Sequence, residues 1–255
     1  ANPNVTANDC FRPVSRYWDR INRPEQLLSS LPAALDVLTD PAQCGPVTLA
    51  IPEDVQAEAA DFPARFFEPR VHRLRRPGPD AGQLAAAAAG LKTAKKPLVI
   101  AGGGVHYALA CGALAEFARR HRLPVAETQA GKGALPWDHA CSVGAIGVTG
   151  TAAANKLAAE ADLVLAIGTR LGDFTTASRS LFQNGAMTLI ALNVAPFDAG
   201  KHGALPLVAD AMRGMEDLSA ALGSWAAPSS WAAKAASLME EWNAASDRVT
   251  APSNA

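Results

Sequence analysis

Short apolar segments alternate with helical segments between residues 79 and 223, and this alternation constrains the fold more than any other feature of the sequence. The strand-like segments are rich in Val, Leu, Ile and Ala and cover residues 97–102, 123–128, 162–168, 187–194 and 205–210. The helix-like segments cover residues 81–94, 103–121, 154–161 and 211–223. Strands that alternate with helices favour a parallel sheet, because right-handed crossovers place the helices on both of its faces. The sequence therefore predicts an α/β domain with a Rossmann-like parallel sheet over residues 79–223.

The regions on either side of this domain have different patterns. Residues 1–56 contain one helical segment, 24–39, and one short strand, 47–51, which cannot enclose a core by themselves. We expect them to be the end of a domain whose earlier part lies outside this sequence. Residues 57–78 are rich in arginine and proline and lack periodicity, as is typical of a linker. Residues 224–255 contain an amphipathic helix that we expect to lead toward a further domain, although a helix that caps the central domain fits nearly as well.

The charge balance and the cysteines limit the class of partner. Lys and Arg total 23 against 24 Asp and Glu, so the chain lacks the basic excess that nucleic acids or anionic membranes attract. The four cysteines are scattered and form no Cys-x-x-Cys pair, which favours a reducing cytoplasm. No segment approaches the roughly 20 apolar residues of a membrane helix. We therefore expect small molecules or proteins as partners.

A glycine-rich loop follows the first predicted strand of the central domain. Gly102 and Gly104 match the first two glycines of the dinucleotide fingerprint Gly-x-Gly-x-x-Gly, but Tyr107 stands at the third. Glu127 falls at the end of the next strand, where the acid that binds the ribose belongs. This partial match leaves three alternatives open, namely a dinucleotide, another ligand, or a tight turn that binds nothing.

Two other glycine-containing segments have features of phosphate-binding loops. The segment before Gly133 is not a P-loop, because Ala126 replaces the first glycine and Gly133 stands where the magnesium-binding Ser or Thr belongs. In residues 144–161 the glycines precede a predicted helix that Thr151 is placed to cap. The N-terminus of such a helix can receive an anion, and a capped loop without a ligand is the alternative.

No catalytic or metal-binding constellation is present in the sequence. No Gly-x-Ser-x-Gly elbow occurs, and the histidines lack the spacing of metal ligands. We therefore assign neither catalytic residues nor metal ligands to this chain.

The motifs, read in order, resemble the thiamine-diphosphate-dependent enzymes of the acetolactate synthase type. "CGPVTLAIPEDVQ" is similar to the segment that closes the pyrimidine-binding domain of this family. "KKPLVIAGGGV", "LPVAETQAGKGALP", "GAIGVTGTAAANKLAAEADLVLAIGTRLGDFTT" and "LNVAPFDAGKH" resemble successive strands and loops of its central domain. Within the family, "NDCFRPVSRYWDRI" and two of these segments most resemble carbon–carbon hydrolases of inositol catabolism that open a cyclic dione, with acetolactate synthases as the close alternative.

The resemblance implies a division of labour among three domains. Residues 1–56 would be the C-terminal end of the pyrimidine-binding domain, 79–223 the central domain, and 224–255 a linker helix toward the diphosphate-binding domain. The family's activating glutamate region and its magnesium-binding Gly-Asp-Gly motif are both absent here. We therefore expect thiamine diphosphate and magnesium to act only in the full-length enzyme, and the fragment alone to be inert. We expect the full-length enzyme to be a cytoplasmic homo-oligomer, a dimer or a tetramer, that acts on a dione or a 2-keto acid.

The resemblance also implies a ligand site in the central domain, which holds FAD in acetolactate synthases and ADP or nothing in other relatives. Carried over by motif, the contact residues are Gly102, Gly103, Gly104, Thr149, Gly150, Thr151, Gly168, Arg170 and Asn193. Flavin-binding relatives read Arg-Phe-Asp-Asp-Arg where this chain has residues 170–174, "RLGDF", without a second arginine. The resemblance thus favours an empty or adenine-nucleotide site over a flavin site, or a scaffold that holds the catalytic domains in register.

Overall fold

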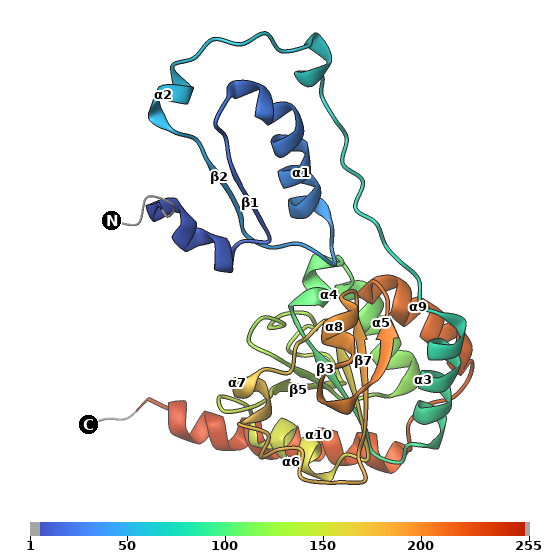
Figure 1. Ribbon diagram of the computed structural model, residues 1–255. Helices are drawn as coiled ribbons and strands as arrows, with labels where there is room; N and C mark the ends of the chain where they lie inside the picture. Colours follow the sequence, from blue (N-terminus) through green and yellow to red (C-terminus); the bar gives the residue numbers. More distant parts are fainter. Residues whose placement is uncertain (1–5, 253–255) are drawn as a thin grey trace. The chain divides into compact units, whose positions relative to one another are not determined.

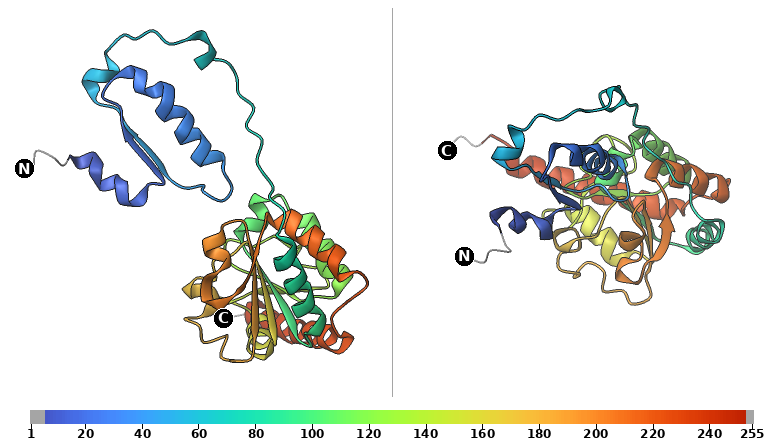
Figure 2. Two further views of the ribbon diagram at one scale, coloured as in Figure 1. Left: turned by 45° about the vertical axis from the view of Figure 1, so that its right-hand side comes forward. Right: turned by 45° about the horizontal axis from the view of Figure 1, so that its top comes forward.

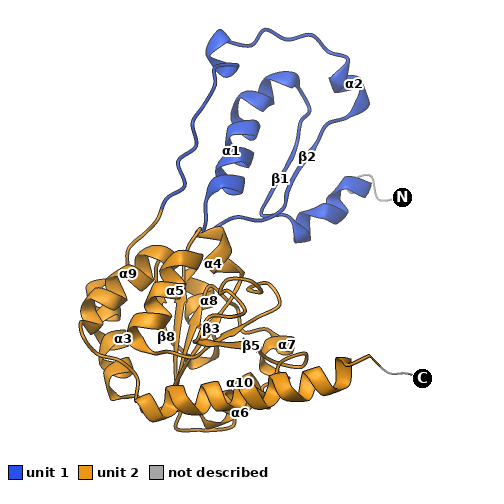
Figure 3. Ribbon diagram, turned by 180° about the vertical axis from the view of Figure 1, so that it is seen from behind, with its two compact units in different colours: residues 1–75 blue, residues 76–255 orange. Residues whose placement is uncertain are grey.

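The computed structural model describes residues 6–252, and the chain divides into two compact units, residues 1–75 and 76–255 (Figure 3). The sequence-based boundaries between the flanking regions, the linker and the central domain stay predictions.

The first unit is built around two parallel strands and one long helix (Figure 1). Its elements are η1 Ala7–Val14, β1 Tyr17–Arg20, η2 Pro24–Gln26, α1 Leu27–Thr39, β2 Val47–Ala50, α2 Glu53–Gln56 and η3 Ala64–Phe66. The predicted helix and strand are confirmed as α1 and β2. Strand β1 was not predicted, because its sequence Tyr-Trp-Asp-Arg has no aliphatic residue and each of its residues is half-buried.

The second unit contains a six-stranded parallel sheet with strand order β5-β4-β3-β6-β7-β8, and the predicted Rossmann-like α/β class is confirmed. The strands are β3 Pro97–Ala101, β4 Val125–Glu127, β5 Ser142–Ala145, β6 Leu163–Ile167, β7 Thr188–Asn193 and β8 Leu205–Val208. The chain runs outward from β3 to β5 and then returns to form β6 on the other side of β3. The order of the strands therefore reverses between β3 and β6, which is where α/β sheets of this kind bind ligands.

Helices cover both faces of this sheet. They are α3 Ala81–Thr93, α4 Gly103–Tyr107, α5 Cys111–His121, α6 Ala152–Glu160, α7 Asp173–Thr176, α8 Pro196–Ala199, α9 Ala211–Leu222 and α10 Ser229–Thr250, with the 3-10 turn η4 Lys201–Gly203. Along β3, Val99 and Ala101 pack in the core beneath α3, α5 and α9, whereas Leu98 and Ile100 pack in the core beneath α6 and α10. Figures 1 and 2 show α3 beside α9 on one face and α10 along α6 on the other.

The helix predicted over 103–121 is interrupted. Leu109 adopts a left-handed conformation with φ 55°, and the Ala110 N–H donates to the Val105 carbonyl oxygen at 2.9 Å, so that α4 ends there and α5 begins at Cys111. Left-handed residues at helix ends are usually glycine or asparagine. Because a leucine occupies this position, the sequence does not indicate that the helix ends here.

The last helix, α10, packs on the sheet through its first half. Trp231 is buried, and its indole N–H donates to the Pro97 carbonyl oxygen at 2.9 Å. One turn away, the Lys234 ammonium lies 2.6 Å from the Glu160 carboxylate of α6. The start of α10 therefore belongs to the core of residues 76–255.

A buried histidine makes the stability of this unit depend on pH. His121 is fully buried; its Nδ1–H donates to the Trp225 carbonyl oxygen at 2.6 Å, and its Nε2 lies 2.8 Å from the Ser219 hydroxyl. Burial lowers the pKa of His121 below its ordinary value of 6.5. As pH falls below 6.5, the unfolded chain binds a proton that the folded chain resists, so the free energy of unfolding decreases.

We expect the free energy of unfolding to fall by up to about 1 kcal/mol per pH unit below pH 6.5, measured by urea titration between pH 8 and pH 5. A His121→Gln variant should be less stable at all pH values but should lose this slope, and the exposed His72→Gln should keep it. Carboxylates with a lowered pKa, such as Glu160, change the free energy of unfolding only below their ordinary pKa, which is 4.5 for Glu160. Their effect therefore does not overlap the range between pH 5 and pH 6.5 in which His121 acts. An unchanged slope in His121→Gln would contradict the assignment.

Candidate functional site

A pocket of about 460 Å³ opens at the carboxyl ends of β3, β4 and β6, at the point where the strand order reverses. Four loops form it, and they follow β3, β4, β5 and β6. Five of the nine residues predicted for this site line the pocket: Gly103, Gly104, Thr149, Gly168 and Arg170. The structure thus brings together residues that are up to 67 positions apart in the sequence, from Gly103 to Arg170.

Gly102 and Gly104 are required by the crossing of two backbones. The Gly102 N–H donates to the Ile167 carbonyl oxygen at 2.8 Å, and the Gly104 N–H donates to the Gly168 carbonyl oxygen at 2.9 Å. A Cβ atom at Gly102 would lie 2.4 Å from the Gly168 carbonyl oxygen, and one at Gly104 would lie 2.6 Å from the Gly168 Cα. Both N–H groups are therefore occupied within the protein, and these two glycines serve the close packing of loops that forms the pocket floor.

The other predicted residues outside the pocket lining also have structural partners. The hydroxyl of Thr151 accepts from the Ala154 N–H at 2.9 Å, which confirms the predicted N-cap, and donates to the Val143 carbonyl oxygen at 2.7 Å. A Cβ at Gly150 would lie 2.7 Å from the Gly147 nitrogen. Asn193, the last residue of β7, donates from its Nδ2 to the Thr169 carbonyl oxygen at 3.3 Å and so links this strand to the loop after β6.

Glu127 does not supply the ribose-binding acid of the dinucleotide fingerprint. Its side chain is buried, and its Oε1 accepts from the Leu135 N–H at 2.8 Å. This carboxylate ties the loop after β4 to the strand and is not part of the pocket lining. The structure therefore contradicts the placement of a dinucleotide ribose at this position.

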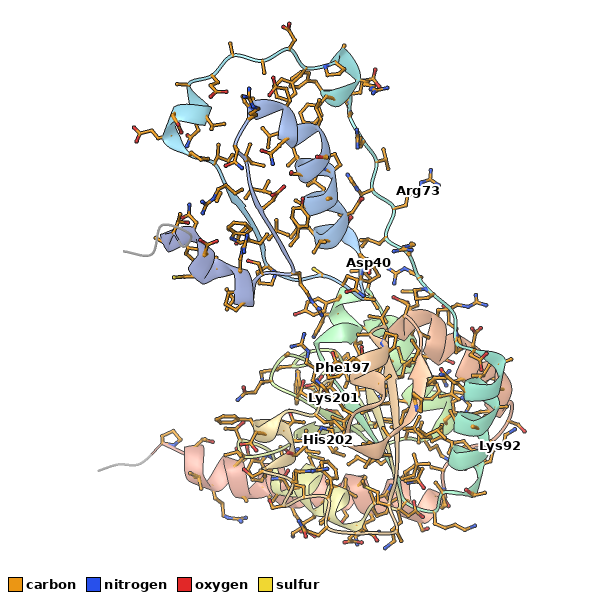
Figure 4. The ribbon with its side chains drawn as sticks, viewed as in Figure 1. Asp40, Arg73, Lys92, Phe197, Lys201 and His202 are labelled. Atoms are coloured by element: carbon orange, nitrogen blue, oxygen red, sulfur yellow. The ribbon has the colours of Figure 1, made fainter. Side chains whose placement is uncertain are left out.

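A small charged cluster borders the pocket at Arg170. The Arg170 Nε lies 3.4 Å from the Asp198 carboxylate, which also binds the Lys201 Nζ at 2.5 Å. Lys201 lies 5.0 Å from the centre of the Phe197 ring, and both residues are labelled in Figure 4. The Arg170 side chain is 78% exposed, so its guanidinium group remains accessible to a ligand at the rim.

Several pocket residues were not predicted as contacts. Tyr107 and Phe174 contribute exposed aromatic rings, and Thr128, Gln129 and Thr169 contribute hydroxyl and amide groups. Each follows or lies near the carboxyl end of a strand, where ligands bind in α/β sheets, and this position is the feature of the sequence that could have identified them. Tyr107, which stands in place of the third glycine of the fingerprint, lines the pocket from the end of α4.

The chemistry of the lining does not fit thiamine diphosphate with its magnesium ion. Hard cations such as Mg²⁺ are held by carboxylate and other oxygen ligands, but no Asp or Glu is among the residues that line this pocket. Within residues 6–252, no three His, Cys, Asp or Glu side chains are grouped as a metal site requires.

Across the same residues, no helix has the length and apolarity to cross a membrane.

The fold defines a Rossmann-type α/β domain, with a pocket at the reversal of strand order. Residues 84–218 match the family described as "Thiamine pyrophosphate enzyme, central domain", and the chain belongs to this family. This confirms the resemblance found in the sequence, and with it a family that uses thiamine diphosphate.

Three curated relatives of the chain carry the name "3D-(3,5/4)-trihydroxycyclohexane-1,2-dione hydrolase". The protein from Clostridium tetani (strain Massachusetts / E88) is 47% identical over 85% of the chain and 34% of its own length. The protein from Bacillus cereus (strain AH820) is 47% identical over 96% of the chain and 38% of its own length. The protein from Clostridium perfringens (strain 13 / Type A) is 45% identical over 98% of the chain and 39% of its own length. The chain therefore spans less than two fifths of the length of these relatives.

Proposed function

We propose that this chain is the central portion of a thiamine-diphosphate-dependent enzyme that hydrolyses a carbon–carbon bond of trihydroxycyclohexanedione. The observation that carries the proposal is the 47% identity over 96% of the chain to a relative with that name. Thiamine diphosphate and magnesium are assigned to other parts of such an enzyme, because the pocket of this chain lacks carboxylates. No catalytic step is therefore assigned to residues of this chain.

The test of this proposal is the activity of the uninterrupted parent protein, purified with thiamine diphosphate and Mg²⁺. We expect it to convert the cyclic dione to a ring-opened acid, to lose this activity on dialysis against EDTA, and to sediment as a dimer or tetramer. Turnover of pyruvate in place of the dione would instead assign the chain to an acetolactate synthase-like enzyme. No cofactor-dependent turnover of either substrate would refute both assignments.

For the pocket itself, we propose an adenine nucleotide such as ADP as the ligand. Its volume of about 460 Å³ lies in the range of small-molecule sites. Hydroxyl and amide groups surround it, Tyr107 and Phe174 offer rings for stacking, and Arg170 offers a charge for phosphate. A flavin is disfavoured because residues 171–174 supply no second arginine. A scaffold with an empty pocket is the competing proposal.

Calorimetric titration of the chain with ADP, FAD and NAD in separate runs tests the pocket. We expect ADP to bind, and an Arg170→Met variant to bind it about tenfold more weakly, since a hydrogen bond to a charged group contributes roughly 1.5–3 kcal/mol. Lys201→Met is the matched control, because Lys201 shares the Asp198 partner but does not line the pocket.

A second pair of variants tests the glycine loop. Gly103→Val should abolish binding by filling the pocket, because a Cβ there already lies 3.2 Å from the Ala130 Cβ. Gly112→Ala should bind as the parent does, because a Cβ at Gly112 meets nothing within 4 Å. Absence of heat with all three nucleotides would make the loop a structural turn and leave the domain as a scaffold.

A further inference from the structure

A cysteine and a histidine form a pair at the junction of α4 and α5, where neither residue lines the pocket. The Cys111 Sγ lies 3.5 Å from the His106 Nδ1, within hydrogen-bond reach for sulfur. The His106 Nε2 lies 3.1 Å from the Lys132 carbonyl oxygen. The Cys111 thiol, the His106 ring and the Lys132 carbonyl oxygen are therefore linked as a nucleophile, a base and a group that orients the base. This arrangement activates cysteine nucleophiles.

The Lys132 carbonyl oxygen determines which nitrogen of His106 carries the proton. A carbonyl oxygen can only accept a hydrogen bond, so the His106 Nε2 carries the hydrogen and donates it. In the neutral ring, Nδ1 then has a free lone pair, and the Cys111 S–H is the donor that reaches it. The imidazole is thus held in the form that can accept the thiol proton.

The backbone holds the pair together by an uncommon turn. Leu109 has a positive φ of 55° although it is not a glycine, and the Ala110 N–H bonds to the Val105 carbonyl oxygen at 2.9 Å. This turn brings the first residue of α5, Cys111, back toward His106 on α4. Cys111 packs against the hydrophobic core but is only half-buried, so part of the residue remains open to a small reagent.

The other cysteines provide an internal comparison. Cys10 and Cys44 are exposed, and no side-chain nitrogen base lies within hydrogen-bond reach of either thiol in the part of the chain that the structure describes. The Cys141 thiol is half-buried and lies 3.5 Å from the Ala118 carbonyl oxygen, and burial raises its pKa. Only Cys111, among these four, combines partial exposure with a partner base in the described structure.

We infer that Cys111 is a reactive thiol, open to modification by hydrogen peroxide, with His106 as its general base. The His106 Nδ1 takes the thiol proton while the sulfur attacks one oxygen of the peroxide. The new S–O bond forms as the O–O bond breaks, and the leaving hydroxide takes the proton from His106 and departs as water. Sulfur is oxidised to a sulfenic acid and peroxide is reduced, so no further reactant is needed.

Competitive labelling of the folded chain tests this inference. The chain is exposed to a limiting amount of iodoacetamide at pH 7, and the label at each cysteine is quantified by peptide mass spectrometry. We expect Cys111 to react about tenfold faster than Cys10 and Cys44, although both of these are more exposed. This factor is smaller than the roughly hundredfold or greater rate increase that a general base provides in an enzyme active site. Cys141 should react slowest. In 8 M urea, where the pair is lost, the four rates should converge. With hydrogen peroxide and dimedone, which traps sulfenic acids, the adduct should form first at Cys111.

The variants separate the base from simple exposure. His106→Gln keeps a donor for the Lys132 carbonyl oxygen but removes the basic nitrogen, and it should reduce the Cys111 rate to that of Cys10. The exposed His72→Gln is the matched control and should leave the rate unchanged. Should His106→Gln fail to fold, the comparison of folded and urea-unfolded parent chain still decides the matter. The inference is overturned if folded Cys111 reacts no faster than Cys10 and Cys44, or if a folded His106→Gln variant labels as fast as the parent.

Discussion

Replacing Gly168 with alanine is expected to lower the free energy of unfolding of residues 76–255 by about 3 kcal/mol, because two penalties combine at this position. Gly168 has a positive φ of 60°, a left-handed conformation that costs any residue with a Cβ about 1 kcal/mol or more. The added Cβ would also lie 2.6 Å from the Gly104 Cα and 3.0 Å from the Gly104 nitrogen. Because these are backbone atoms, no side chain can rotate away to relieve the overlap.

The consequence extends from stability to the pocket. Gly104 donates to the Gly168 carbonyl oxygen at 2.9 Å, so relieving the overlap requires the loops after β3 and β6 to separate and weakens this hydrogen bond. Those two loops form the floor of the candidate site. We therefore expect Gly168→Ala to reduce any nucleotide binding as well as stability.

Thermal unfolding followed by circular dichroism measures the first effect, and about 3 kcal/mol corresponds to a decrease in Tm of roughly 10 °C for a unit of this size. Gly112→Ala is the matched control. It places the same methyl group in open space on a helix, and should keep or slightly raise the Tm. Equal Tm values for the two variants would show that the loops are not packed as closely as the structure has them.

The central sheet could be predicted because its strands are continuous apolar runs. β3, β6 and the inner part of β7 are buried on both faces of the sheet, and this environment selects the unbroken Val, Leu and Ile residues that the sequence displays. β1 and β5 lack that signal. β5 has the sequence Ser-Val-Gly-Ala, includes Gly144 at φ 77°, and lies at the edge of the sheet, so that pairing with β4 rather than composition makes it a strand.

The glycines of the candidate site could be predicted from the sequence, but most of the side chains that line the pocket could not. Glycine is needed where backbones touch, as at Gly102 and Gly104, and such residues can be recognised from spacing alone. The functional interpretation of Glu127 failed, because the same carboxylate that fits a ribose also fits a buried N–H, and the sequence does not distinguish the two. The position of Phe174 depends on how the loop after β6 folds, and its place beside the pocket could only be seen in three dimensions.

The second large effect is expected at Trp231, which fixes α10 to the sheet. Trp231 is 3% exposed, and its indole N–H donates to the Pro97 carbonyl oxygen at 2.9 Å. Trp231→Ala leaves a cavity in the core shared with α6 and leaves that carbonyl oxygen without its partner, so we expect a loss of about 4 kcal/mol in the free energy of unfolding. Trp231→Phe keeps most of the packing and should lose only about 1–2 kcal/mol.

Urea unfolding of the two variants, with Trp137→Ala as the control, tests whether α10 is part of this core. Trp137 is 88% exposed, so its removal should change the free energy of unfolding by less than about 0.5 kcal/mol. Limited proteolysis adds a local measurement, because a detached α10 should be cleaved in Trp231→Ala while the sheet resists. If Trp231→Ala unfolds with the same midpoint as Trp137→Ala, α10 contributes nothing to the domain. The expectation that this helix leads toward a further domain would then gain support over the alternative that it caps the central domain.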